Sequence, residues 1–270
     1  MDMSISLSIN SNTPIVSGIT PLPDGGQTAY SIARIIPFET EHTGAIIRVR
    51  RSSDNLELDI STSGGNLDET ALLAHTGAGD GFVVTAYDQT ANTNDWVTAN
   101  AAAQSKIVSS GVVEKVNGKP AIFSGSSDYL RVLGITGGSA TTAFHVISSA
   151  STSRITIGSN DGAAYYGIAT SGNVSDNYNN AGTPAIYVNG SSIGSTRGDL
   201  YTALDGIQAI NTYTGLDLSY VGWSNFQTLY KTLSSFEPHS YIQETIIYDS
   251  DKSANRTAIE TNINDYYTIY

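Results

Sequence analysis

The chain contains no cysteine, which excludes disulfide bonds and thiolate metal sites. Only 14% of its 270 residues are charged, and the formal net charge is −12, so Lys and Arg are scarce. Nucleic acids and anionic membranes bind clustered Lys and Arg, and we therefore expect neither as a partner. The one basic cluster, residues 48–51, is small, and we expect it to pair with the carboxylates that follow it, Asp54, Glu57 and Asp59.

The sequence also lacks segments that direct a protein into or across a membrane. Residues 1–9 have neither the basic start nor the long apolar run of a signal peptide. No stretch approaches the roughly 20 apolar residues that span a bilayer. We therefore expect a soluble protein made in a cytoplasm. The histidines have no metal-ligand spacing, being widely separated at His42, His75, His145 and His239.

What the chain does contain is a series of short apolar runs separated by Gly, Asn, Asp and Ser turns. Such spacing predicts an all-β fold, an antiparallel two-sheet jelly-roll sandwich. The expected strands are residues 45–50, 82–87, 121–123, 129–133, 143–148, 154–157, 165–169, 185–188, 219–222 and 241–248. In the last of these, period-two alternation places Ile242, Glu244, Ile246 and Tyr248 on one face.

Two segments are typical of helices instead. Residues 68–75 begin with acidic side chains and continue with small or apolar ones, which suits the helix dipole. Residues 253–267 form the second expected helix, with Ser253 as its N-cap. Its predicted apolar face consists of Ala258, Ile259, Ile263, Tyr266 and Tyr267.

The N-terminal segment has a pattern of its own. Residues 4–9 alternate Ser with Ile or Leu, which is typical of a strand, and turn-rich residues 13–14 and 21–26 follow. We interpret residues 1–28 as an arm and linker that anchors the protein by adding a strand to another chain's sheet. Residues 29–270 then form the jelly-roll domain. The alternative, that the arm pairs within its own sandwich, stays open.

Two motif blocks carry a family resemblance. The first consists of residues 29–31 (AYS) and 43–55 (TGAIIRVRRSSDN), and the second of residues 80–89 (DGFVVTAYDQ) followed by Asn92 and Asn94. Together they resemble the opening of the arabinofuranosidase B catalytic domain, a concanavalin A-like sandwich. Similar blocks occur in phage structural proteins with a laminin-G-like jelly roll. Residues 117–130 resemble the first strand pair of such jelly rolls, and residues 241–251 their closing strand.

The resemblance bears on catalysis. Retaining glycosidases use two carboxylates, a nucleophile and a proton donor, about 5–5.5 Å apart. The family's nucleophile follows a Gly-Asn-type turn, and Asp161 is the only candidate here. The stretch that matches the proton donor holds Ser224 and Asn225, and a chain without cysteine cannot form the family's sugar-facing disulfide. We therefore expect no catalytic residues and no appreciable arabinofuranosidase activity.

Glycan binding is a separate matter. Asp88, Gln89, Asn92 and Asn94 offer hydrogen bonds to a sugar and Trp96 a stacking surface, and the other candidates are Tyr165, Tyr166 and Trp223. A strand end with an Asx turn, and a packed core, explain the same residues structurally. Oxygen ligands for Ca²⁺ are present at Asp128, Asp249 and Asp251, but no twelve-residue calcium loop exists, so we assign no metal or other cofactor.

From the resemblance we expect a non-enzymatic virion structural protein, such as a capsid decoration, fibre or tail component. It would lie on the virion surface, contact other virion proteins through its N-terminal arm, form homo-oligomers and bind host-surface glycans. One alternative is an arabinofuranosidase-like glycoside hydrolase. A second alternative, a bacterial surface adhesion module, is disfavoured by the missing export signal.

Overall fold

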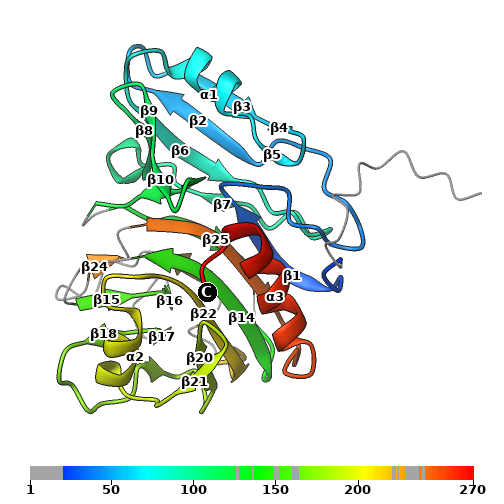
Figure 1. Cartoon of the computed structure of the whole chain (residues 1–270), viewed down its shortest axis with the longest axis vertical. Helices are drawn as coiled ribbons and strands as arrows, with labels where there is room; N and C mark the ends of the chain where they lie inside the picture. Colours follow the sequence, from blue (N-terminus) through cyan, green and yellow to red (C-terminus); the bar gives the residue numbers. More distant parts are fainter. Residues whose placement is uncertain are drawn as a thin grey trace, which may run out of the picture.

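A computed structural model describes residues 21–125, 128–135, 137–148, 153–159, 164–220, 223, 225–228, 237–238 and 241–270. Within these ranges the chain forms two facing antiparallel sheets (Figure 1). Sheet A has the strand order β21 (Ser191–Ile193), β20 (Ala185–Val188), β22 (Gln208–Leu216), β14 (Thr141–Ser148), β25 (Tyr241–Tyr248) and β1 (Gly26–Ser31). The predicted all-β sandwich is confirmed.

Sheet B contains the first motif blocks and part of the middle of the chain. Its order is β3 (Glu57–Ile60), β2 (Ile47–Arg51), β6 (Gly81–Ala86), β7 (Trp96–Val97), β13 (Leu130–Leu133), β23 (Asn225–Thr228), β16 (Ile157–Ser159), β17 (Tyr165–Tyr166) and β19 (Tyr178–Asn179). Strand β8 (Lys106–Ser109) pairs with β6, with β9 (Val112–Val113) and with β12 (Ile122–Phe123). Because β12 also pairs with β25, it joins the two sheets at one end.

Small elements complete the described chain. Strand β4 (Thr62–Ser63) pairs with β5 (Asn66–Leu67), and β10 (Lys115–Val116) with β11 (Lys119–Pro120). Strand β15 (Ser153–Ile155) lies between β18 (Ala169–Thr170), which is antiparallel to it, and β24 (Glu237–Pro238), which is parallel. The helices are α1 (Glu69–Thr76), the 3-10 turn η1 (Ala101–Ala103), α2 (Arg197–Leu204) and α3 (Arg256–Tyr267). No helix in the described ranges has the length and apolar character to cross a bilayer.

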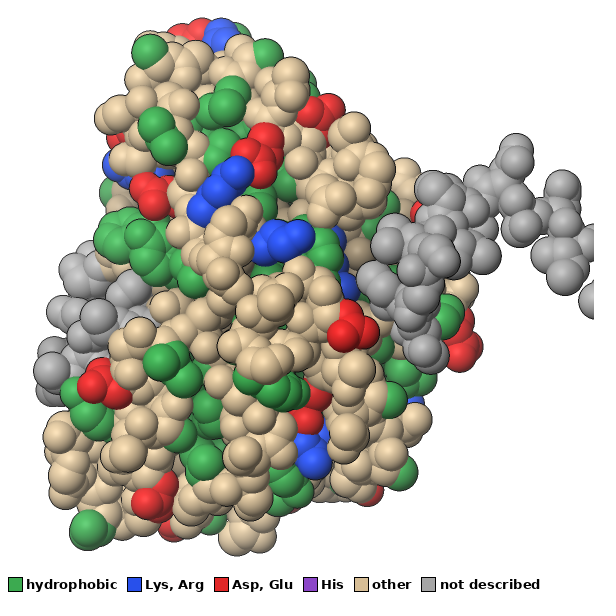
Figure 2. All heavy atoms as spheres, viewed as in Figure 1, with side chains coloured by type: hydrophobic (Ala, Val, Ile, Leu, Met, Phe, Trp, Pro, Cys, Tyr) green, Lys and Arg blue, Asp and Glu red, His purple; other side chains and the backbone are tan. Residues whose placement is uncertain are grey.

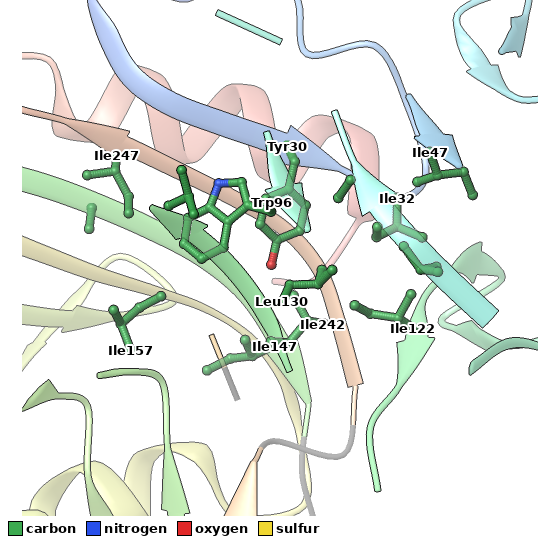
Figure 3. Packing of buried hydrophobic residues seen from close by; sticks show 14 of the residues in the cluster. Tyr30, Ile32, Ile47, Trp96, Ile122, Leu130, Ile147, Ile157, Ile242 and Ile247 are labelled. Atoms are coloured by element: carbon green, nitrogen blue, oxygen red, sulfur yellow. The ribbon is translucent and has the colours of Figure 1, made fainter. Parts of the chain in front are cut away.

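The main hydrophobic core lies between the sheets and draws side chains from both of them (Figure 3). Tyr30 of β1 and Trp96 of β7 are fully buried there, with ring centroids 5.3 Å apart. Sheet A has a second core on its outer face, where Ile259, Ile263 and Tyr267 of α3 cover Ile246 and neighbouring side chains. Figure 1 shows α3 lying across this face. Sheet A is therefore buried on both sides.

Strand β25 departs from strict alternation. Ile246 and Tyr248 share one face, as predicted, and pack in the outer core with α3, but Ile242 points into the core between the sheets. The reason is a β-bulge: Val146 pairs with Glu244 and Ile147 with Ile242, which leaves Gln243 as the extra residue. The prediction that Ile242 shares the face of Ile246 was therefore wrong.

The two predicted helices exist with shifted starts. In α1, Asp68 is the N-cap and its side chain accepts from the N–H of Ala71. In α3 the N-cap is Asn255, not Ser253, because Ser253 lies in a turn with its N–H on Asp251. Ala258 is exposed rather than packed, since only the helix positions nearer the sheet reach the core.

Helix α2 and strand β22 were missed by the sequence analysis. A capping box marks the start of α2, because the Thr196 and Asp199 side chains each accept a hydrogen bond from the other's backbone N–H. In the predicted strand over residues 219–222, Ser219 and Tyr220 are not in a strand, and residues 221–222 lie outside the described ranges. The predicted strands 154–157 and 165–169 are each interrupted, at Thr156 and at residues 167–168.

The small basic cluster pairs largely as predicted. Arg48 lies 2.7 Å from Asp59, and Arg51 lies 2.7 Å from Asp54. Arg50 donates instead to the side-chain oxygens of Gln104 and Asn55. On the face seen in Figure 2, charged side chains are scattered among polar ones and form no basic patch.

A buried ion pair connects three parts of the chain. Arg34 follows β1 and donates from Nε and Nη2 to both carboxylate oxygens of Glu244 on β25, each at 2.8 Å. It also donates to Asn262 of α3 at 3.2 Å, while the Tyr267 hydroxyl donates to Glu244 at 3.2 Å. The side chains of Arg34 and Glu244 are only 3% and 1% exposed. The pair is thus enclosed by sheet A and α3.

We predict that Arg34→Met lowers the free energy of unfolding by about 3–5 kcal/mol, because it leaves a buried carboxylate without its partner. Urea titration measures this change. Arg48→Met is the matched control and should cost at most about 1 kcal/mol, because the Arg48–Asp59 pair is exposed to solvent. Equal losses in the two variants would contradict the structural role given to Arg34.

The core between the sheets also contains a buried histidine. The two ring nitrogens of His145 lie 3.2 Å from Thr245 Oγ1 and 3.2 Å from the Tyr166 hydroxyl. Burial lowers the pKa of His145 to about 3. In the unfolded chain the ring would titrate near the ordinary value of about 6.5. The fold therefore holds the neutral ring at pH values where the unfolded chain takes up a proton.

We predict that stability is fully retained above about pH 6.5 and falls as the pH drops below it, by about 1.4 kcal/mol per pH unit from His145. The loss continues until the pH reaches the folded pKa of about 3. Urea titrations at about pH 7.5 and about pH 5 measure it. His145→Gln should reduce this difference, whereas the control His42→Gln should preserve it. The same difference in all three proteins would refute the assignment.

Candidate functional site

The described residues enclose a pocket of about 310 Å³ beside strand β1. Four segments line it: residues 24–26 before and at the start of β1, residues 38–40, residues 89–92 of the β6–β7 loop, and the turn after β25. Its lining residues are Asp24, Gly25, Gly26, Phe38, Thr40, Gln89, Thr90, Ala91, Asn92 and Asp249. Two sequence-predicted candidates, Gln89 and Asn92, therefore meet in this pocket.

One wall depends on contacts between residues 22–24 and 37–40. The Leu22 N–H donates to the Pro37 carbonyl at 2.7 Å, and Leu22 and Phe38 form a parallel bridge. Asp24 then accepts from the N–H and hydroxyl of Thr40, at 3.0 and 2.5 Å. Residues 21–28, which the sequence assigned to the linker, thus include the start of β1 and this wall. Residues 1–20 lie outside the described ranges.

The opposite wall is the loop between β6 and β7, and Asp88 organises it. Its carboxylate is 3% exposed and accepts four hydrogen bonds, from the N–H groups of Ala29, Thr90 and Asn94 and from the Thr90 hydroxyl, at 2.7–3.0 Å. Every one of these donors is local or belongs to β1. Asp88 therefore acts as an Asx-turn residue, as the structural interpretation of the motif expected.

The same loop covers the outer edge of β1. The Gln89 N–H donates to the Ala29 carbonyl at 2.7 Å, and the amide groups of Asn92 and Asn94 donate to the Gln27 carbonyl at 3.1 and 2.8 Å. An uncovered edge would expose these backbone groups to pairing with other chains. Gly26 permits the close approach, because a Cβ there would lie 2.9 Å from Thr90 Cγ2.

The candidates of this motif differ in what they can offer a ligand. Gln89 is buried. Its side-chain amide accepts a hydrogen bond from the Ile36 N–H and donates one to the Arg34 carbonyl. Trp96 is fully buried and donates to Thr28 at 2.8 Å, so it belongs to the core rather than to an exposed stacking surface. Asn92 is exposed, and within the described chain its Oδ1 accepts no hydrogen bond.

The pocket is acidic. Hydrogen bonds from the side chain and backbone of Thr40 lower the pKa of Asp24, so its carboxylate is ionised near neutral pH. Asp249 adds a second, exposed carboxylate. No cluster of three or more His, Cys, Asp or Glu suited to a metal ion occurs among the described residues. The lining therefore favours a neutral ligand rich in hydroxyl donors over an anion.

The remaining candidates lie far along sheet B, around β17. Tyr166 and Trp223 are fully buried, with ring centroids 5.7 Å apart, and the Trp223 indole donates to the Asn180 carbonyl. Tyr165 is half-buried, and its hydroxyl accepts from Arg197 at 2.7 Å. These contacts fit the packing interpretation for Tyr166 and Trp223.

The catalytic expectations concern other positions. Asp161, the nucleophile candidate, lies outside the described residues, as does Ser224. Asn225 begins β23. Asp24, Thr40 and Asp249 were not predicted as glycan ligands, because no local pattern marks them and they meet only through tertiary contacts.

Comparison with known proteins gives a fold relation. No family model and no curated protein matches the chain. Among solved structures, a GH54 α-L-arabinofuranosidase soaked with a cyclic sulfate inhibitor is similar with a TM-score of 0.55 and 16% identity, over 87% of this chain. An arabinofuranosidase complexed with arabinofuranosyl-α-1,2-xylobiose is similar with a TM-score of 0.55 and 15% identity.

The chain spans only about 62% of the length of the first of these enzymes. At such low identity the similarity shows a shared β-sandwich fold. It supports the part of the sequence resemblance that pointed to arabinofuranosidases. Nothing in these comparisons supports the virion structural role expected from the sequence.

We predict that Asp88→Ala lowers the free energy of unfolding by about 1–3 kcal/mol, because the buried N–H of Ala29 and the half-buried N–H of Asn94 lose their acceptor. It should also promote aggregation by uncovering the edge of β1. Urea titration and light scattering measure the two effects. Asp54→Ala, at an exposed ion pair, is the control and should change little. A soluble Asp88→Ala protein with unchanged stability would contradict the capping role.

Proposed function

We propose that this chain is a carbohydrate-binding domain whose pocket beside β1 binds an arabinofuranose-containing glycan. The observation that carries the proposal is the pocket's lining, in a fold shared with arabinofuranosidases. Asp24, Asn92 and Asp249 line the pocket together with the apolar Phe38. Sugars are recognised by this combination of a few placed polar groups and an apolar surface.

Each polar group has a distinct part in the proposed site. Asp249 and Oδ1 of Asn92 accept hydrogen bonds from sugar hydroxyls, while Asp24 is held in place by Thr40 and presents its negative charge. Carboxylates make strong, charge-assisted hydrogen bonds with hydroxyl donors. The two carboxylates also repel phosphate and uronate groups, so the expected ligand is a neutral glycan.

Binding is tested by calorimetry with neutral arabino-oligosaccharides. Ala91 is an exposed lining residue, and Ala91→Trp should fill the pocket and weaken binding at least about tenfold, or ~1.4 kcal/mol. The matched control, Ala102→Trp, places the same ring on η1 outside the pocket and should bind like the unchanged protein. Asp249→Ala should weaken binding with an unchanged melting temperature. Binding that is insensitive to Ala91→Trp would refute the site.

Hydrolysis is the second candidate, favoured by the arabinofuranosidase fold. We expect binding without turnover, because hydrogen bonds from Thr40 lower the pKa of Asp24, which opposes the protonated form that a general acid needs. The test is release of nitrophenol from 4-nitrophenyl α-L-arabinofuranoside. Robust turnover that Asp161→Asn abolishes, with Ala91→Trp unaffected, would establish an enzyme with a different site.

A further inference from the structure

The edge strands β1 of sheet A and β3 of sheet B differ in whether the described chain covers them. The outer edge of β1 is covered by the Asp88 loop, as described above. Strand β3, at the end of sheet B, pairs with β2 on one side, and no described strand pairs with its other side. Strand β3 is only four residues long, but the unpaired backbone N–H and C=O groups of an edge strand can pair with an added strand. The edge of β3 is therefore available to an added strand.

The side chains of this edge include exposed leucines. Leu58 lies opposite Val49, which is buried in the core between the sheets, so Leu58 is on the inward face of sheet B. Period-two alternation places Leu56 and Ile60 on that face as well. Ile60 is 1% exposed, but Leu58 is 45% and Leu56 is 56% exposed. The inward apolar face thus extends beyond the part that the described chain covers.

The N-terminal segment has the complementary pattern. In residues 4–9 (SISLSI), Ile5, Leu7 and Ile9 alternate with serines. Added to β3, such a strand would continue the apolar face of Leu56 and Leu58 and place its serines beside the polar Glu57 and Asp59. The backbone of β3 would also form inter-strand hydrogen bonds with the added strand, which its open edge lacks. One segment therefore satisfies the edge's backbone and side chains together.

We infer that residues 4–9 of one copy add as a strand to β3 of a second copy, and that two copies exchange their arms. Eleven residues separate this segment from Pro21, a length that reaches at most about 40 Å when extended. A connection of this length is enough to reach a neighbouring copy, and Pro14 and Pro21 restrict the backbone conformations open to it. Because each copy supplies one arm and one edge, reciprocal exchange closes a symmetric dimer.

Sedimentation of the full-length chain tests the dimer, with an expected mass about twice 28.5 kDa. Leu7→Lys should give monomers, because it places a charge on the apolar face. Ser6→Lys introduces the same side chain one position away, on the polar face beside Glu57 and Asp59, and should leave the dimer intact. Leu58→Lys should give monomers, and the control Leu133→Lys, at an exposed leucine of β13, should not. The inference would be overturned if the protein without substitutions sediments as a monomer, or if Leu7→Lys and Ser6→Lys have equal effects.

Disulfide trapping separates exchange from pairing within one chain, and the absence of native cysteine makes it clean. The backbone of Leu58 points toward β2, so it would occupy a non-hydrogen-bonded position against an added strand, where cross-strand disulfides fit. Leu58→Cys protein is mixed with Ile5→Cys, Leu7→Cys or Ile9→Cys protein. At least one mixture should give a covalent heterodimer, and Ser6→Cys should not. A comparison sample carries both cysteines in one chain. A crosslink that forms within that chain, while none of the mixtures gives a heterodimer, would overturn the exchange.

Discussion

The buried pair of Arg34 and Glu244 is the constraint on which the arrangement of sheet A and α3 depends. A buried charge without its partner is strongly destabilising, so the segment after β1, the strand β25 and the helix α3 must come together in one arrangement. Strand β25 is the last strand of the chain, yet it lies between β1 and β14 and contributes to both cores. The sandwich is therefore completed only when the C-terminal strand and helix are in place.

The Asp88 motif illustrates how one structural device can create a surface for another purpose. The loop of residues 88–94 satisfies the outer edge of β1 through the backbone and the side chains of Asp88, Asn92 and Asn94. Its outer surface, placed beside the Asp24–Thr40 contact, then becomes the wall of an acidic pocket. Within the described chain, the end strand of sheet B, β3, has no such cover, and apolar side chains there are left in solvent.

Much of the fold was predictable because its signals are local. Short apolar strands with turn residues between them predict an antiparallel sandwich, and the acidic start of residues 68–75 predicts α1. Strand β22 was missed because both of its faces are buried, so polar and apolar side chains do not alternate along it. Helix α2 was overlooked although Thr196 and Asp199 mark its start. The bulge at Gln243 shifted Ile242 to the other face, which no alternation pattern reveals.

The sequence by itself determined the fold class, the absence of disulfides and the polar, acidic character of the surface, because these follow from composition and short-range periodicity. Only the tertiary structure decided that Asp88 accepts hydrogen bonds from backbone groups and that Trp96 packs in the core. Both had been candidates for sugar contacts. It alone brought Asp24, Asn92 and Asp249 around one pocket. Residues so far apart in the chain meet through long-range strand pairing, and a pattern read over a few neighbouring residues carries no record of that pairing.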